Sequence, residues 1–307
     1  MRVFITGING FVGGHLSNLL LSRKYEVSGI GILGNFYGNK KANYYEVNLL
    51  NPNKLEQILS QVKPQLIFHL AGFSSVKKSF EQPGLCKKIN VTGTKNLLDA
   101  VIDSKINPKI LVVSSAEVYG IPQSVPIKET ADLNPKNPYG ASKKEQEGLC
   151  KKYMEKLHII VSRSFPHIGP GQQPLFVMSD FAKQIAEIEK GKKPVINVGN
   201  LEAERDFTDV RDIVKAYLLS LQKCIHGEFY NICSKKAYSI KKVLNMLLSM
   251  SNAKIDIKID PKKMRASDIP VLLGDNEKFC RQTGWKPKIQ LKKTLKDLLD
   301  YWREKIK

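Results

Sequence analysis

The sequence lacks the long apolar run that a membrane-spanning segment requires. Hydrophobic residues make up 42% of the 307-residue chain. However, no stretch approaches the ~18 consecutive apolar residues that are typical of a transmembrane helix. The chain begins MRVFITG, without a long apolar region or a small-residue cleavage site. We therefore expect no membrane span, no signal peptide and a cytoplasmic location.

Cysteines are few, and they follow no pattern of a disulfide or zinc framework. There are five, an odd number, and no two form a C-x-x-C pair. We interpret them as reduced, buried thiols of a cytoplasmic protein, and we expect no metal site. They are Cys86, Cys150, Cys224, Cys233 and Cys280.

Acidic residues are scarce relative to basic ones. The chain has 29 Asp and Glu against 49 Lys and Arg, a formal charge of +20. The lysines of 141–156 and 286–307 alternate with acidic and apolar residues, as on solvated helix faces. The sequence contains no recognisable nucleic-acid-binding module, so we expect no nucleic-acid partner. The positive field suits a doubly charged phosphate substrate.

Short apolar runs alternate with helical patterns through the first half of the chain. Continuous apolar runs indicate strands that are buried on both faces of a parallel sheet. The sequence therefore predicts a doubly wound α/β fold of the Rossmann type. The expected strands are 2–6, 26–31, 65–70, 109–115, 158–164 and 228–232, and the expected helices are 11–24, 53–62, 90–104, 139–156 and 207–222.

Further helices, at 176–190, 239–250 and 290–306, and short strands at 194–198 and 254–259, indicate a smaller lobe built from separated segments. We predict a dinucleotide-binding domain of 1–173 plus 207–239. The predicted substrate lobe is 174–206 plus 240–307, with the ligand in the cleft between the two.

A glycine cluster follows the first expected strand. Gly7, Gly10 and Gly13 have the spacing G-x-x-G-x-x-G and open an apolar helix. Gly7 permits a tight turn, Gly10 a close approach of the backbone to a pyrophosphate, and Gly13 packing of the helix on the sheet. The end of the second strand, VSGIGILGN, offers neither an acid nor an arginine. Its nearest cations are Lys40 and Lys41, and the missing acid favours NADP slightly over NAD.

Tyr139 and Lys143 lie four residues apart, one helical turn, in the stretch NPYGASK. A cation at that distance favours the phenolate, so we expect Lys143 to lower the pKa of Tyr139 and Tyr139 to act as a general acid. Ser115 ends the strand 109–115 at the sheet edge where ligands bind, and it can hydrogen-bond a developing alkoxide. Ser114 is the rival for that role. His69 and His167 read as structural histidines without a proton role.

With these residues on one scaffold, the chain resembles the extended short-chain dehydrogenase/reductase family. HLAG (69–72) is similar to the family's H-L-A-A, and NVTGTKNLLDA (90–100) to its N-V-x-G-T helix. Further similar stretches are SSAEVYG (114–120), GPGQ (169–172), RDFTDVRDIV (205–214) and GWKPKI (284–289). Residues 167–214 most resemble the branch that reduces GDP-4-keto-6-deoxy-D-mannose.

The resemblance implies hydride transfer from a reduced nicotinamide to the C4 ketone of a GDP-linked 4-keto-6-deoxy sugar, giving GDP-D-rhamnose. It places Ser115 at the catalytic position and has Lys143 hold the nicotinamide ribose. It also implies a homodimer packed through helices 90–104 and 139–156, although Leu97, Leu98, Val101 and Ile102, at helical spacing in the first, fit a face buried on the sheet equally well. The implied cofactor-binding residues are Gly7, Asn9, Gly10, Phe11, Val12, Gly13, Asn48, Leu49, Leu70, Ala71, Gly72, Ser114, Tyr139, Lys143, Phe165 and His167.

Two arginines are the predicted clamps on the substrate pyrophosphate, because a guanidinium meets phosphate oxygens in bidentate fashion. They are Arg205 and Arg265, with Lys183 assisting. Asp268 would accept a hydrogen bond from a ribose hydroxyl. The resemblance also assigns Ser115, Pro166 and Val177 to substrate binding.

Two positions leave the reaction open. Glu117 has the spacing at which related dehydratases carry the acid/base for water elimination, so a GDP-mannose 4,6-dehydratase or an epimerase is an alternative. Pro166 replaces the family's usual asparagine and removes a donor, which also allows a scaffold that has lost turnover. A further departure, Asn48, stands where an aspartate commonly meets the adenine amino group; it matters less, because an amide can still accept through its oxygen.

Overall fold

A parallel sheet of seven strands forms the centre of the computed structural model, which describes residues 1–32, 41–264 and 269–306. All neighbouring strands in this sheet pair in parallel. The doubly wound α/β prediction is confirmed. From edge to edge the strands are β11 (Phe229–Ile232), β6 (His158–Ser164), β5 (Lys109–Ser115), β4 (Leu66–His69), β1 (Arg2–Thr6), β2 (Glu26–Gly31) and β3 (Asn43–Glu46).

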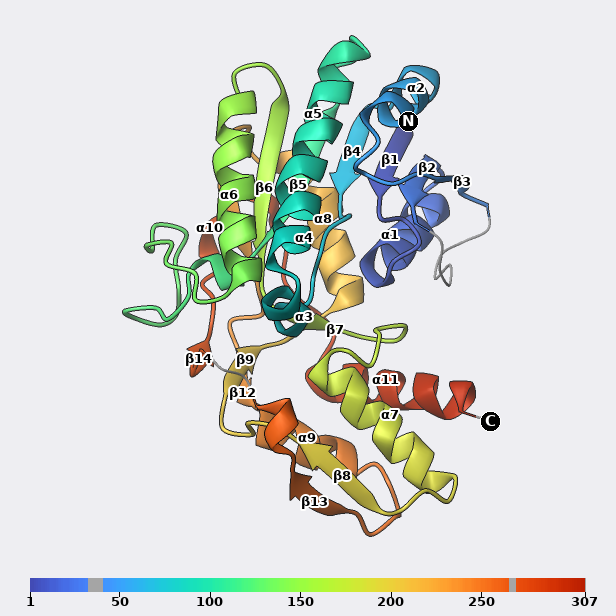
Figure 1. Ribbon diagram of the computed structural model, residues 1–307, viewed down its shortest axis with the longest axis vertical. Helices are drawn as coiled ribbons and strands as arrows, with labels where there is room; N and C mark the ends of the chain where they lie inside the picture. The colour runs from blue at the N-terminus through green and yellow to red at the C-terminus, as the bar shows by residue number, and fades with distance from the viewer. Residues whose placement is uncertain (33–40, 265–268, 307) are drawn as a thin grey trace.

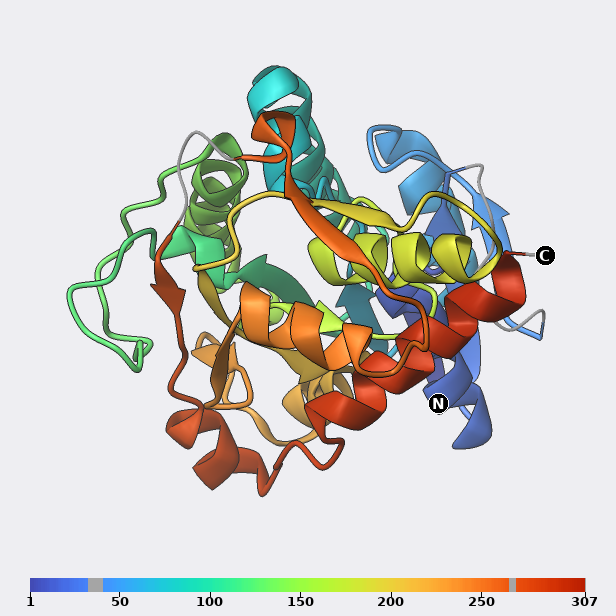
Figure 2. The same cartoon turned by 90° about the horizontal axis from the view of Figure 1, so that it is seen from below.

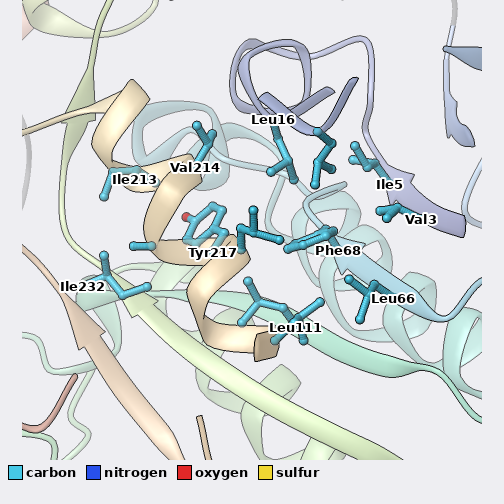
Figure 3. Close-up of a cluster of buried hydrophobic side chains, with 14 of the residues drawn as sticks. Val3, Ile5, Leu16, Leu66, Phe68, Leu111, Ile213, Val214, Tyr217 and Ile232 are labelled. Carbon is cyan, nitrogen blue, oxygen red and sulfur yellow. The ribbon is translucent and has the colours of Figure 1, made fainter. Parts of the chain in front are cut away.

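Helices cover both faces of this sheet (Figure 1). On one face, α1 (Phe11–Ser22) and α8 (Val210–Lys223) pack over Val3 and Ile5, the cluster drawn in Figure 3. On the other face, α2 (Pro52–Val62), α5 (Gly93–Asp103) and α6 (Pro138–Tyr153) pack over Phe4. Successive strand residues point to opposite faces, so a continuous apolar run supplies both cores.

The apolar face of α5 was one of the features on which the expected dimer depended. Leu97, Leu98 and Val101 are fully buried in the chain's own core against the sheet. They are therefore explained within one chain and do not themselves argue for a second copy. The homodimer stays a prediction.

Several helices and strands of the structure were not predicted from the sequence. Strand β3 has a mostly exposed surface, so it carries no apolar run. Between β4 and α5 the chain forms α3 (Val76–Glu81), α4 (Pro83–Lys87) and a π-helix, η1 (Lys88–Thr92), which extends the predicted 90–104 helix backwards. The other short elements here are the 3-10 helix η2 (Ala116–Val118) and the paired strands β7 (His167–Ile168) and β10 (Thr208–Asp209).

A second, smaller core lies below the sheet, and Figure 2 shows its helices from that side, with α7 and α11 next to each other. It contains α7 (Val177–Glu189), α9 (Ile240–Leu248), α11 (Leu291–Lys305) and the paired strands β8 (Val195–Val198) and β13 (Asp256–Ile259). Strand β9 (Glu204–Asp206) pairs with β12 (Ala237–Ser239) and β14 (Val271–Leu272), and η3 (Pro261–Lys263) follows β13.

The last part of the chain contributes buried side chains to both cores. Phe279, on α10 (Glu277–Thr283), and Trp285 pack in the core with α1 and α8, although both lie in the segment 240–307 that we assigned to the substrate lobe. The division of the chain into two domains stays a prediction.

No helix within the described ranges is long and apolar enough to cross a membrane. Among the same residues, no group of three or more His, Cys, Asp or Glu is placed to hold a metal ion.

Candidate active site

A cleft of about 980 Å³ opens at the carboxyl ends of the central strands. Its walls come from the β1–α1 turn, the loop after β4, the end of β5, the start of α6, and from α7 and β9 of the smaller core. In doubly wound sheets this edge, where the strand order reverses, is where ligands bind. Here the reversal lies between β1 and β4.

The glycine turn between β1 and α1 has the shape that a dinucleotide needs. Gly7 has a φ of 74°, the left-handed region. A Cβ at Gly13 would lie 2.1 Å from the carbonyl oxygen of Gly7, so only hydrogen fits there. Helix α1 starts at this turn with no side-chain cap, which leaves its first N–H groups available to an anion. The turn therefore fits the pyrophosphate of a dinucleotide.

Every residue that the sequence suggested for the cofactor lines this cleft. Asn48 also accepts a hydrogen bond from Leu50 N through Oδ1, at 2.9 Å. Phe11 stacks on His167 with the ring centroids 6.3 Å apart. Burial lowers the pKa of His167, which keeps this ring neutral at physiological pH.

The end of β2 carries no carboxylate in its described part, Gly31 and Ile32. The Asn9 amide fills the space beside Gly31, where a Cβ would lie 2.0 Å from Asn9 Oδ1. Asn9 Nδ2 donates to the carbonyl oxygen of Ile32 at 2.6 Å. Lys40 lies outside the described residues.

Tyr139 enters the cleft from the first turn of α6. Asn137 caps this helix by accepting a hydrogen bond from Gly140 N at 2.8 Å, and Pro138 occupies the first helical position. The helix therefore begins immediately before Tyr139, and one turn later Lys143 lies on the same wall of the cleft. The predicted pairing of these two positions on one helix matches the observed geometry.

The expected pKa of Tyr139 was wrong. Burial raises the pKa of Tyr139 well above its usual value; a hydrogen bond with Ser115 lowers it, and the charge of Glu117 raises it. Desolvation disfavours the phenolate and outweighs the hydrogen bond. Tyr139 is therefore a neutral phenol at physiological pH, which is the form that can donate a proton.

The two serines at the end of β5 point to different partners. Ser114 Oγ donates to Glu147 Oε1 at 2.6 Å, in a buried position. Ser115 Oγ accepts from Glu117 N at 3.2 Å and also hydrogen-bonds Tyr139. Ser115 is therefore the hydroxyl beside the phenol, while it also caps the 3-10 helix η2.

Lys143 is buried, and burial lowers its pKa to about 8. Its Nζ donates to the carbonyl oxygen of Val113 at 2.8 Å and to Gln146 Oε1 at 3.0 Å. Glu117 lies in the same cleft and accepts a hydrogen bond from Asn137 Nδ2 at 2.7 Å. The helix cap thus also fixes this carboxylate.

Most of the suggested substrate residues also line the cleft, among them Pro166, Val177 and Arg205. Arg205 is buried and donates to the carbonyl oxygens of Glu204 and Ile269 at 2.8 and 2.6 Å. Arg265 and Asp268 lie outside the described residues.

Lys183 requires a correction, because it does not line the cleft. It pairs with Glu187 at 3.7 Å and lies 5.8 Å from the Trp302 ring centroid on α11. The α7 residues that line the cleft are Val177, Met178, Asp180 and Phe181, and position 183 falls on the neighbouring face of the helix.

Sequence reasoning missed several residues that shape the cleft. Asn90, fully buried on η1, holds the loop after β4 by accepting from Phe73 N at 2.8 Å. Lys263 lines the opposite side and pairs with Asp180 at 2.6 Å. The NVTGT stretch contains Asn90, but nothing in its spacing shows which loop that side chain would hold.

Comparison with models of known protein families shows to which family the chain belongs. A model of the family described as GDP-mannose 4,6 dehydratase matches residues 4–298. The chain belongs to this family. Its fold is that of the extended short-chain dehydrogenases/reductases, as the sequence motifs suggested.

Relatives across this family are similar over the full chain. GDP-6-deoxy-D-mannose reductase of Pseudomonas aeruginosa is 32% identical over 100% of this chain and 98% of its own length. The structure of RMD from Pseudomonas aeruginosa complexed with NADPH has a TM-score of 0.88 at 32% identity and covers 99% of both chains. UDP-glucose 4-epimerase of Thermus thermophilus in complex with NAD has a TM-score of 0.89 at 27% identity, covering 99% of both. The chain is an NAD(P)-dependent oxidoreductase that acts on a nucleotide sugar.

Proposed function

We propose that the protein reduces the C4 ketone of GDP-4-keto-6-deoxy-D-mannose to GDP-D-rhamnose. The observation that carries this proposal is the position of the Tyr139 hydroxyl, which hydrogen-bonds Ser115 inside the cleft at the end of β5. Reduction of a ketone needs a proton donor at the carbonyl oxygen, and a phenol with a raised pKa is protonated at neutral pH. The similarity to the Pseudomonas aeruginosa reductase supports the same reaction.

The chain's own residues divide the work. Ser115 and Tyr139 hydrogen-bond the C4 oxygen, and Tyr139 gives it a proton as negative charge develops there. Lys143 keeps a positive charge near the site and holds a ribose of the dinucleotide. A reduced nicotinamide, held at the Gly7–Gly13 turn, would supply the two electrons and the hydrogen for C4.

Substrate binding falls to the second wall of the cleft. Arg205 offers the guanidinium for the pyrophosphate. Val177 begins α7, whose first turn faces the same space. Arg265 and Asp268 keep their predicted roles on sequence grounds alone, and Lys183 has none in this proposal.

We propose NADPH as the preferred cofactor. The missing carboxylate at the end of β2 and the NADPH complex of the Pseudomonas aeruginosa structure support it. Fluorescence titration of the protein with NADPH and NADH gives both Kd values. A clear preference for NADH would contradict this choice.

Glu117 supports a second candidate, a GDP-mannose 4,6-dehydratase, because its carboxylate lines the cleft near Tyr139.

One assay separates the reductase from the dehydratase. The protein is incubated with GDP-mannose alone, and separately with GDP-4-keto-6-deoxy-D-mannose plus NADPH or NADH. A reductase is expected to consume the reduced cofactor in the second mixture and to leave GDP-mannose unchanged in the first. Turnover of GDP-mannose without added reductant would identify a dehydratase, and cofactor binding without turnover on a panel of keto-sugar nucleotides would identify a scaffold.

Two further proposals concern the assembly and its location. We propose a homodimer formed through α5 and α6, and a cytoplasmic enzyme. Analytical ultracentrifugation at several protein concentrations tests the first. A single species at 34.6 kDa, the mass of one chain, would contradict it.

Pro166 provides a prediction about substrate specificity. Pro166→Asn restores a side-chain donor in the cleft without changing the glycine turn. We expect an altered KM for GDP-4-keto-6-deoxy-D-mannose and an unchanged Kd for NADPH. Thr208 N donates to the carbonyl oxygen of Pro166 at 3.0 Å, so the new residue keeps this backbone contact. An unchanged KM would show that position 166 does not contact the sugar nucleotide.

A further inference from the structure

The buried ammonium of Lys143 is held by one side chain and one backbone group. Val113 O is a backbone acceptor that any residue at 113 would supply. Gln146 Oε1, at 3.0 Å, is a specific acceptor, one turn further along α6. Gln146 is buried and does not line the cleft. Its contact with Lys143 therefore comes from inside the protein, behind the site.

The amide of Gln146 is fixed in one orientation. Its Nε2 donates to Thr94 Oγ1 at 2.7 Å, so Oε1 must face Lys143. Thr94 cannot return a proton to this amide, because its hydroxyl donates to the carbonyl oxygen of Asn90 at 2.6 Å. Thr94 Oγ1 is then purely an acceptor toward Gln146.

His69 completes the arrangement. Its Nε2 lies 2.9 Å from Thr94 Oγ1, and its Nδ1 lies 2.7 Å from Thr6 Oγ1. Burial lowers the pKa of His69 to about 3, so the ring is neutral. Since Thr94 has already given its proton to Asn90, His69 Nε2 carries the ring hydrogen. Thr6 then donates to Nδ1 and accepts from Ala71 N at 3.1 Å.

The result is a buried network of hydrogen bonds in which two arms converge on Thr94: Thr6 donates to His69 and His69 to Thr94 on one side, and Lys143 donates to Gln146 and Gln146 to Thr94 on the other. Thr6, His69, Thr94 and Gln146 are all buried. Each donor in the network has one acceptor, so reversing any member would leave a buried polar group unpaired, which is unfavourable. The network therefore specifies a single position for the acceptor beside Lys143.

We propose that Gln146 is the positioning residue of the active site, which holds the ammonium of Lys143 in place and charged, with its amide oriented by Thr94 and His69. The inference rests on the proposed function only in that Lys143 acts in that reaction. Gln146 touches neither cleft nor ligand, so its effect passes entirely through the lysine.

The groups around Lys143 define what a change at 146 would do. Burial lowers the pKa of Lys143, and the charge of Glu147 opposes this by raising it. Cys86 and Cys150 stay neutral thiols, because burial raises the pKa of each. His69 is neutral and adds no charge. Removing the acceptor at 146 disfavours the ammonium, whereas a carboxylate there favours it. Activity that needs the ammonium is retained below the pKa of Lys143 and lost as pH rises through it.

Two variants therefore shift the alkaline limb of the kcat/KM profile in opposite directions. Gln146→Met keeps the length of the side chain and removes the acceptor, so the limb is expected to move to lower pH by about 1 unit. Gln146→Glu places an opposite charge within hydrogen-bond distance of Lys143 and is expected to move the limb to higher pH by about 1 unit. In this variant the Thr94 hydroxyl must turn from Asn90 O and donate to the new carboxylate. If the alkaline limb of the kcat/KM profile stayed at the same pH in both variants, Gln146 would have only a structural role.

A matched pair of threonines tests the orienting network. Thr94→Val removes the acceptor for Gln146 and His69, and we expect a limb that moves in the same direction as in Gln146→Met. Thr283→Val is the control, because Thr283 is equally buried and donates to the carbonyl four residues earlier, Phe279 O, at 2.7 Å. Both lose stability, but only Thr94→Val should alter the pH profile. Equal profiles in the two variants would overturn the role of the network.

A readout without turnover separates this proposal from the reaction itself. Trace labelling with acetic anhydride at a series of pH values, read by peptide mass spectrometry, measures the titration of Lys143 directly. Opposite shifts in the two Gln146 variants, in a protein that reduces no keto-sugar nucleotide, would retain the positioning role and refute the proposed function. Reductase activity with an unmoved Lys143 titration would do the reverse.

Discussion

Tyr139→Phe is expected to lower kcat for ketone reduction about a thousandfold, the middle of the range for loss of a positioned general acid. The ring remains and fills the same place at the start of α6, so the Kd of NADPH should stay within about twofold. The loss follows from the raised pKa of Tyr139, because burial holds it as the proton-carrying phenol beside Ser115. Stopped-flow measurement of NADPH oxidation, with parallel binding titrations, provides both numbers.

Tyr119→Phe is the matched control for that variant. Tyr119 is fully buried, lies outside the cleft, and donates to Asn231 Oδ1 at 2.7 Å. Losing this hydroxyl is expected to cost stability, by about 1–3 kcal/mol for an unsatisfied partner, without a loss of kcat. If the Tyr139→Phe enzyme kept more than a tenth of the wild-type kcat, Tyr139 would not be the general acid, and Glu117 would be the next candidate.

The pKa of Tyr139 also shows where a sequence pattern stops being informative. The spacing of Tyr139 and Lys143 correctly predicted two residues on one wall of a helix, because a helical turn is a local property. It predicted the wrong direction for the phenol, because desolvation depends on which distant segments cover it. Charge is visible in a sequence, whereas burial of an individual atom is not.

The same distinction separates the correct from the incorrect site residues. The glycine turn was predictable, since Gly7 and Gly13 act within seven residues of chain. Lys183 was not, because its role depended on which face of α7 turns to the cleft, and α11 decides that by packing against it. Likewise, His69, Thr94 and Gln146 come from three separate elements, and no spacing in the sequence indicates that their side chains meet.

For the fold, continuous apolar runs identified six of the strands that the central sheet contains. Strand β3 is the exception, because an edge strand with an exposed surface has no apolar run to detect. Phe279 and Trp285 show a second limit. Their apolar side chains were visible, but nothing local indicated that they complete the core of the first half of the chain.

Breaking the ion pair between Glu147 and Arg163 is expected to lower the free energy of unfolding more than any of the other substitutions. Arg163, on β6, donates to Glu147, on α6, at 2.8 Å, with side-chain exposures of 6% and 2%. Arg163 also donates to Tyr119 OH at 3.1 Å and to Glu129 O at 2.9 Å, and Ser114 donates to the same carboxylate. The pair thus joins α6 to β6 and, through Ser114, to the end of β5.

Breaking this pair from one side leaves a buried charge without its partner. Glu147→Gln is therefore expected to lower the free energy of unfolding by about 3–5 kcal/mol. Arg163→Met should cost a similar amount, and the double variant should cost less than the sum, because it leaves neither charge behind. Urea unfolding of the three proteins measures these differences.

The exposed pair of Arg281 and Glu277 is the natural control, with the same 2.6–2.8 Å range of contact but side-chain exposures of 76% and 53%. Because water already solvates both groups, Arg281→Met should change the free energy of unfolding by less than about 1 kcal/mol. If Glu147→Gln were as mild as Arg281→Met, water would have to reach the buried guanidinium. If instead the double variant lost the full sum, Glu147 and Arg163 would contribute through separate contacts, and the link between β5, α6 and β6 would not depend on their charges.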